Sequence, residues 1–402
     1  PPQTARDTQK RRFPPRPVAR SRKDVQNGGR YRPPHQDAMQ SLLHYLSYWD
    51  SALAVVLVFG GLIFFHELGH FIAFRTFKVG VITFSIGMGP KLCSFRRGKT
   101  EYRLSWLPFG GYVSGVGEYS NEVESLGFTQ EEAVNSKPAW QRLIIAFAGP
   151  FMNLVIAWLI YWGLTLTSGL AVTLPQAGVI MEGSAAMQAG MLPGDMITAI
   201  DGVTIDRWSQ VPETVGASGG RTLKVQVERD GQTLTFDMTP ARSERTNIFG
   251  ETETAWLIGV QASGAVRYEP KGFFESAALG LRQTWNMIDI TLTGLKKLVT
   301  GSVAADSVGG PILIAQMLGQ QAEAGIVPLL LLTALISVNL GLLNLFPIPV
   351  LDGGAILFCI VEIIVRRPVP EKVQEWSMRV GASLLIALMI FATFNDVMRW
   401  FR

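Results

Sequence analysis

Long apolar runs recur four times along this chain of 402 residues. A helix needs about 20 mostly apolar residues to cross the roughly 30 Å of hydrocarbon in a bilayer. All four runs meet this length, and they fall at 51–74, 143–166, 327–346 and 378–398. The pattern therefore predicts a polytopic α-helical membrane protein with about four transmembrane helices.

The segment between the first two runs has a different pattern. Residues 80–117 are rich in β-branched and aromatic side chains, with glycine at the positions of turns, which is typical of short strands. We expect a small membrane-associated β-sheet whose edge could pair with an extended peptide. Residues 41–169 would then form the first half of a membrane core, and residues 327–402 the second half.

Residues 170–262 lack apolar runs and read as one small β-rich module. A short helix is expected from Ser184, and apolar and polar positions alternate over 223–227 and 234–238 around the turn Asp230-Gly231. Such alternation about an Asp-Gly pair favours a β-hairpin. We expect this module to be a single α+β domain outside the membrane.

Residues 263–326 form a connector between the module and the third apolar run. Within it, residues 272–300 repeat with a helical period but are interrupted by Glu275, Arg282 and Asp289. This is typical of an amphipathic helix lying at the membrane surface. A fifth membrane span is the alternative interpretation.

Charge is concentrated at the start of the chain. Residues 1–40 hold ten Lys and Arg against three Asp and Glu, a net charge of +7, whereas the other residues hold 26 and 29, a net of −3. The first segment has almost no apolar residues, so we expect a disordered basic tail. The nearly neutral remainder argues against nucleic-acid binding.

Positive charge also predicts the orientation in the membrane. Residues 75–97 hold five Lys and Arg directly after the first apolar run, while residues 33–50 hold none after Arg32. Because short cytoplasmic segments carry the excess of Lys and Arg, the far end of the first span should face the cytoplasm. The module at 170–262 would then be extracytoplasmic. The two cysteines, Cys93 and Cys359, form no metal-binding spacing and are expected to be buried thiols.

The first apolar run carries the strongest chemical signal, the sequence His66-Glu67-Leu68-Gly69-His70. An ionisable side chain at bilayer depth costs about 2.5–3.5 kcal/mol on insertion scales, so these residues are candidates for function. His66 and His70 share one face of a helix and can hold one metal ion together. Glu67 is placed to act as a general base without being a ligand. In a soluble helix the same residues could simply be polar surface, but that alternative is weaker inside a span.

A second polar motif follows the third apolar run. Two histidines leave a zinc ion short of a third protein ligand, and Asp352 is the best candidate in the rest of the chain. Pro347 and Pro349 end the preceding span, and the glycines after Asp352 permit tight backbone geometry. The alternative is an ordinary aspartate at a helix terminus.

Together the two motifs resemble the site-2 protease family of intramembrane zinc metalloproteases. The resemblance rests on the HExxH sequence at 66–70 and on Asn-x-x-Pro-x-Pro-x-Leu-Asp-Gly at 344–353. It extends over about residues 50–400 and includes Phe-Gly-Gly-Tyr-Val at 109–113 and Gly-Pro-Phe-Met-Asn at 149–153. The module at 170–262 resembles a PDZ domain, although well-known members carry two of these and this chain has room for one.

The resemblance implies a set of roles. Zn²⁺ would be the cofactor and Glu67 the catalytic base. The implied zinc ligands are His66, His70 and Asp352, and the residues implied to contact the substrate or lie near the site are Asn344, Pro347 and Asn153.

The resemblance also implies substrates and a location. The substrates would be single-pass transmembrane proteins already trimmed by another protease, such as anti-sigma factors, or remnant signal peptides. The enzyme would be a multi-pass protein of the bacterial inner membrane, with its active site toward the cytoplasm. Two rival functions stay open at this point: a non-catalytic membrane scaffold that collects partners through the PDZ-like module, and a zinc-dependent transporter.

Overall fold

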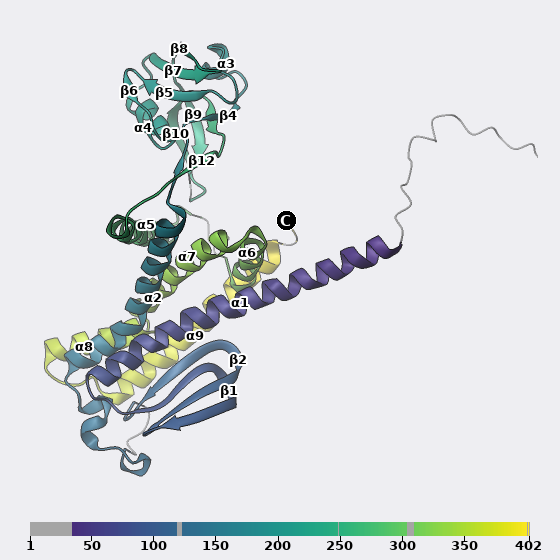
Figure 1. Cartoon of the computed structure of the whole chain (residues 1–402). Helices are drawn as coiled ribbons and strands as arrows, with labels where there is room; N and C mark the ends of the chain where they lie inside the picture. Colours follow the sequence, from purple (N-terminus) through teal and green to yellow (C-terminus); the bar gives the residue numbers. More distant parts are fainter. Residues whose placement is uncertain (1–33, 119–122, 248, 304–308, 400, 402) are drawn as a thin grey trace, which may run out of the picture. The chain divides into compact units, whose positions relative to one another are not determined.

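The computed structural model describes residues 34–401, apart from 119–122, 248, 304–308 and 400 (Figure 1). Residues 1–33 of the expected basic tail lie outside the described residues. Helix α1 (Pro34–Thr76) begins within the segment expected to be the tail. Proline is favoured in the first turn of a helix, and Ala, Met and Gln in this segment are good helix formers.

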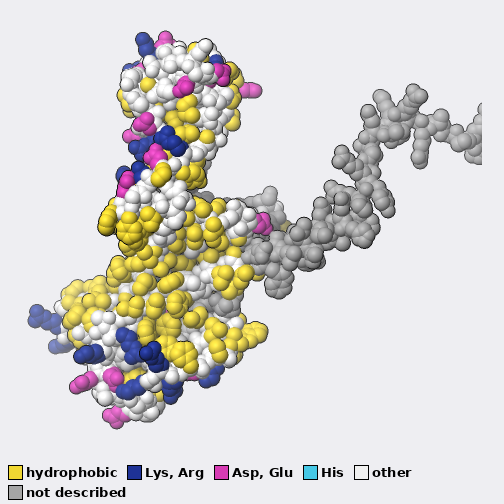
Figure 2. Space-filling model, in the orientation of Figure 1, with side chains coloured by type: hydrophobic (Ala, Val, Ile, Leu, Met, Phe, Trp, Pro, Cys, Tyr) yellow, Lys and Arg dark blue, Asp and Glu magenta, His cyan; other side chains and the backbone are white. Residues whose placement is uncertain are grey.

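Four helices of the described residues are long and apolar enough to cross a membrane, which confirms the prediction. The four segments are Ala52–Thr76 of α1, α2 (Ala139–Ser168), α7 (Ile326–Asn344) and α9 (Glu371–Arg399). Large apolar side chains stay exposed on them; Leu57 of α1, for example, is 64% exposed. Figure 2 shows hydrophobic side chains spread over the helical part of the visible face. Such a surface suits contact with lipid rather than water, and the protein is a multi-pass membrane protein.

The remaining helices are shorter or more polar. Helix α5 (Phe273–Val299) covers the segment expected to be amphipathic, and it is not among the candidate spans. Helices α6 (Pro311–Ala324) and α8 (Asp352–Val365) flank α7 in the chain. Three 3₁₀ turns, at Glu124–Leu126, Gln130–Glu132 and Val134–Ser136, precede α2.

Residues 80–117 form an antiparallel hairpin of two long strands, β1 (Val81–Arg97) and β2 (Thr100–Gly115), whose pairing has several register shifts. The first part of β1 packs with Phe74 of α1 in a hydrophobic cluster. The second part of β1 is exposed. Cys93 lies on this exposed part, so the expectation that it is buried is wrong, whereas Cys359 is buried as expected.

The β-rich module has its own core and several small antiparallel sheets. One sheet has the order β6-β5-β7-β8, and the turn at Asp230-Gly231 joins its last two strands as predicted. The last strand of the module pairs with its first strand, so the module extends to Glu269. The helices and strands are α3 (Ala185–Gln188), α4 (Gln210–Ala217), β3 (Leu170–Thr173), β4 (Ala177–Ile180), β5 (Met196–Ile200), β6 (Val203–Thr204), β7 (Leu223–Arg229), β8 (Gln232–Met238), β9 (Ala241–Thr246), β10 (Thr252–Leu257), β11 (Val260–Ala262) and β12 (Val266–Glu269).

The hydrophobic core of the module follows the alternation seen in the sequence. On β7 the alternate side chains Leu223, Val225 and Val227 are fully buried. The helix expected from Ser184 is α3, and the Ser184 hydroxyl caps it by accepting a hydrogen bond from the backbone N–H of Met187. These elements confirm the helix and hairpin predicted from the sequence.

Candidate active site

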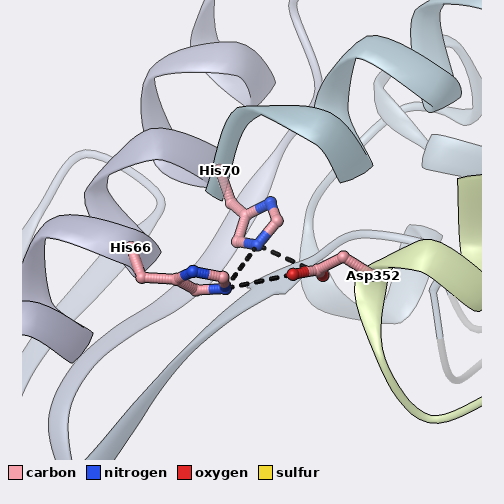
Figure 3. A group of neighbouring side chains, drawn as sticks. All are labelled: His66, His70 and Asp352. Atoms are coloured by element: carbon pink, nitrogen blue, oxygen red, sulfur yellow. Dashed lines mark hydrogen bonds and ion pairs between the residues drawn. The ribbon is translucent and has the colours of Figure 1, made fainter. Parts of the chain in front are cut away.

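Helix α1 presents His66 and His70 on one face, and α8 brings Asp352 against them (Figure 3). The Nε2 atom of His66 lies 3.1 Å from Oδ2 of Asp352, and Nε2 of His70 lies 3.4 Å from Oδ1. The two Nε2 atoms are 3.2 Å apart. All three side chains thus turn one potential ligand atom toward a common point, with these atoms within 4.8 Å of one another. Two imidazoles and one carboxylate are a typical protein ligand set for catalytic zinc.

Helix α2 packs against the two histidines. Nδ1 of His70 donates to the backbone carbonyl of Ile145 at 2.8 Å. Gly149 faces both imidazoles so closely that a Cβ atom there would lie 2.2 Å from Nε2 of His70. Only glycine leaves this space free. The Gly149 position therefore lets the second span approach the pair of histidines.

Asn153, one turn further along α2, contacts His66. Its side chain is 1% exposed, its Nδ2 lies 3.2 Å from Nδ1 of His66, and its Oδ1 is buried without a partner. A histidine that binds metal through Nε2 carries its proton on Nδ1 and must donate from there. The unpartnered Oδ1 is the acceptor such a proton needs once the amide is rotated, since amide O and N occupy equivalent positions. The buried amide therefore fits a metal at His66.

The carboxylate of Glu67 is held by the β-hairpin. Its Oε2 accepts a hydrogen bond of 3.0 Å from the backbone N–H of Val113 on β2. Glu67 also lines the cavity that contains His66 and His70. One carboxylate oxygen is thus anchored to the sheet, which leaves the other available to a water molecule in the cavity.

The loop before α8 positions Asp352. This aspartate is the first residue of α8, so the expected polar loop ends in a helix whose N-terminus carries the carboxylate. Gly353 packs so tightly on the loop that a Cβ atom there would lie 2.1 Å from the carbonyl oxygen of Phe346. Val350 has a φ of 137°, which is a strained conformation for a β-branched residue. Such strain is typical of backbone held in place for function.

The site opens into a cavity of about 640 Å³. Asn344, Asn153 and Asp352 line it, together with Pro349 and Val350. The predicted substrate-contacting residue Pro347 is exposed and is not among the lining residues. The residues that the sequence analysis missed are those whose backbone or packing makes the contact, such as Ile145 and Val350, while Val113 was named only as part of the motif at 109–113 and given no role. Their side-chain types carry no signal for such a role.

Comparison with known proteins agrees with this geometry. The model of peptidase family M50 matches residues 54–388. The chain belongs to peptidase family M50. Both motifs and all three facing ligand candidates lie within the matched residues.

Relatives across several bacteria support the assignment to peptidase family M50. The chain is 38% identical over 355 residues to the "Putative zinc metalloprotease Atu1380" of Agrobacterium fabrum, covering 85% of this chain and 94% of that protein. It is 29% identical over 427 residues to the regulator of sigma-W protease RasP of Bacillus subtilis, covering 88% and 99%. It is 30% identical over 427 residues to the zinc metalloprotease RasP of Bacillus licheniformis, covering 88% and 100%. The protein is accordingly a zinc metalloprotease, and the rival interpretations as a scaffold or a transporter are set aside.

Proposed function

We propose that this peptidase cleaves transmembrane segments of single-pass membrane proteins within the membrane, with His66, His70 and Asp352 as its zinc ligands. The observation that carries the proposal is the meeting of these three side chains at a helix segment apolar enough to span a bilayer. Metal ligands on such a helix are not expected in a soluble protease, because each ionisable side chain at bilayer depth makes membrane insertion less favourable.

The chemistry assigned to each residue follows from its contacts. When bound, zinc supplies a Lewis acid that activates water and polarises the scissile carbonyl. Glu67 takes the proton of the attacking water on its Oε1 and passes it to the leaving amine. Its other oxygen, Oε2, stays on the N–H of Val113, so the carboxylate keeps its orientation during the transfer.

The substrate has to be extended at the cleavage point, because a helix encloses its own carbonyl groups. We propose that the edge of the β1–β2 hairpin pairs with it, because Gly111 and Val113 of β2 lie against the cavity. Asn344 in the cavity wall would hold the substrate strand from the other side, and Pro347 would shape the loop that carries Asp352.

The biological substrates we propose are anti-sigma factors trimmed beforehand by another protease, or remnant signal peptides. The name of the Bacillus subtilis relative, regulator of sigma-W protease, supports this choice. The enzyme would lie in the bacterial inner membrane with the active site toward the cytoplasm and the PDZ-like module outside.

The PDZ-like module would help to select the substrates. Removal of 170–269 should then change which substrates are cut; an unchanged substrate profile would argue against a selecting role for the module.

The proposal is tested with purified protein and a panel of single-pass substrates already lacking their outer domains. We expect cleavage inside the apolar segment, abolished by a zinc chelator and by Glu67→Gln. The matched control is Glu371→Gln, an exposed glutamate in the first turn of α9, which should leave cleavage unchanged. Cleavage confined to soluble parts of the substrates would contradict intramembrane proteolysis.

A further inference from the structure

An ion pair joins α2 to α8 at the edge of the active-site cavity. The guanidinium of Arg142 on α2 donates to Oε1 of Glu362 on α8 at 2.5 Å, and both side chains are roughly four-fifths buried. A second nitrogen of Arg142, Nε, donates to the backbone carbonyl of Lys137 at 3.2 Å. Among the described residues this is the only ion pair that α2 makes. Arg142 is thus held from two sides and fixes Glu362 in turn.

Of the two helices that this pair connects, one contacts the histidines of α1 and the other carries Asp352. Helix α2 supports the histidines through Ile145 and Asn153. Helix α8 carries Asp352 as its first residue. Glu362 lies ten residues later, about 15 Å along the axis at 1.5 Å per residue. A helix of this length moves as a rigid unit. A displacement of its C-terminal end, at Glu362, therefore changes the orientation of the carboxylate at its N-terminal end, at Asp352.

The near end of α8 has little freedom of its own. Gly353 and Gly354 pack directly against the backbone of the preceding loop, so α8 can pivot there but cannot slide. Among the described residues, Glu362 makes the polar contact between the far end of α8 and α2. The pivot, the packing of α8 on α2 and the ion pair together therefore set the direction in which Asp352 points.

We propose that Arg142 and Glu362 are positioning residues for the zinc site: their ion pair sets the distance between the Asp352 carboxylate and the two histidines. This inference rests on the proposed roles of the three ligands. A planar guanidinium suits the task because it offers donors in fixed directions to both Glu362 and the Lys137 carbonyl. The pair contacts neither the metal ligands nor the scissile bond directly.

A charge-reversal cycle tests the pair. The variants are Arg142→Glu, Glu362→Arg and the double exchange, with Arg142→Lys as a conservative variant should a reversal fail to fold. The matched control exchanges the exposed pair Arg245–Glu253 of the β-rich module. The measured quantities are zinc affinity by competition with a chromogenic chelator, kcat and KM on a transmembrane substrate, and the melting temperature without zinc.

Each single reversal should weaken zinc binding by about 10–100-fold, the range known for groups that orient metal ligands. It should lower kcat by a larger factor than it changes KM. The double exchange should recover part of both losses, because it restores the ion pair but not the hydrogen bond to the Lys137 carbonyl. Arg142→Lys should lose less than either reversal, and the control exchange should stay close to the unmodified enzyme. A fall in melting temperature with unchanged zinc affinity would overturn the inference, as would an effect on KM alone.

The zinc measurement keeps this test separate from the proposed function. An enzyme that binds zinc but cuts no transmembrane substrate would refute intramembrane proteolysis and still report on the ion pair. Equal zinc affinities in all variants would refute the positioning role and leave the proposed function standing.

Discussion

The β-rich module buries an aspartate and the membrane site holds one that is partly buried, and the groups around the two carboxylates differ. In the module, Asp195 is 1% exposed and is closed off by Arg229, whose Nε lies 2.6 Å from Oδ1 and whose second nitrogen lies 2.7 Å from Oδ2. In the membrane core, Asp352 faces His66 and His70 at the wall of a cavity of about 640 Å³.

The difference separates structural from chemical use of a charge. The bidentate pair with Arg229 satisfies both oxygens of Asp195, and the N–H of Leu192 adds a third hydrogen bond, so nothing is left to bind a ligand. At Asp352 the neighbouring groups are two imidazoles, the metal ligands proposed above, and they open onto a cavity. A partly buried carboxylate whose hydrogen-bond partners are incomplete is therefore the better indicator of function.

The largest effect is expected at Glu67. Replacement by Gln removes the general base and should lower kcat by at least about 10²–10⁴-fold, while zinc binding is retained because Glu67 is not a ligand. Steady-state cleavage and zinc content measured on the same preparation check this. A variant that loses both would show that Glu67 helps to hold the metal.

The next effect concerns Asp352. Exchange for Asn removes the charge of the proposed ligand and should weaken zinc binding by more than about 100-fold, since groups that only orient metal ligands are worth about 10–100-fold. Competition with a chelator measures it. The matched variant in the module, Asp195→Asn, should leave zinc affinity unchanged; equal losses in the two variants would abolish the contrast drawn above.

A smaller loss is expected when Asn153 is replaced by Ala. The ligand set stays complete, but Nδ1 of His66 loses the amide beside it, so zinc affinity should fall by about 10–100-fold. Replacement of Ser337, which donates to the backbone carbonyl of Asn153 at 2.7 Å, by Ala is a neighbouring control that spares the amide. A zinc affinity that falls as far with Ser337→Ala would attribute the effect to packing.

The smallest effect on catalysis is expected for Asp195→Asn, which should act on stability instead. The hydrogen bonds from Arg229 hold the pKa of the Asp195 carboxyl below its ordinary value. Its contribution to stability is therefore complete above about pH 4, the unfolded value, and is lost as the pH falls toward the lower folded pKa. At neutral pH the variant should melt about 4–8 °C lower, and the difference should shrink below pH 4. Calorimetry across pH measures this; a difference independent of pH would exclude the charge as its cause.

Much of the fold was predictable because its signals are local. The four apolar runs, the alternation around Asp230-Gly231 and the cap at Ser184 each depend on residues close together in the chain. The error at Cys93 has a tertiary cause, because the burial of this residue depends on how far α1 covers the hairpin.

The sequence by itself determined the residue types of the candidate site and their order along the chain, because HExxH on an apolar helix and an aspartate after Pro-x-Pro restrict the chemistry to metal binding within a membrane. Only the tertiary structure decided what surrounds them. The N–H of Val113 and the carbonyl of Ile145 are backbone groups brought close by packing, and these groups do not depend on the side chain that a residue carries. Contacts of this kind leave no mark in the sequence, since they depend on where the chain runs rather than on which side chain it carries.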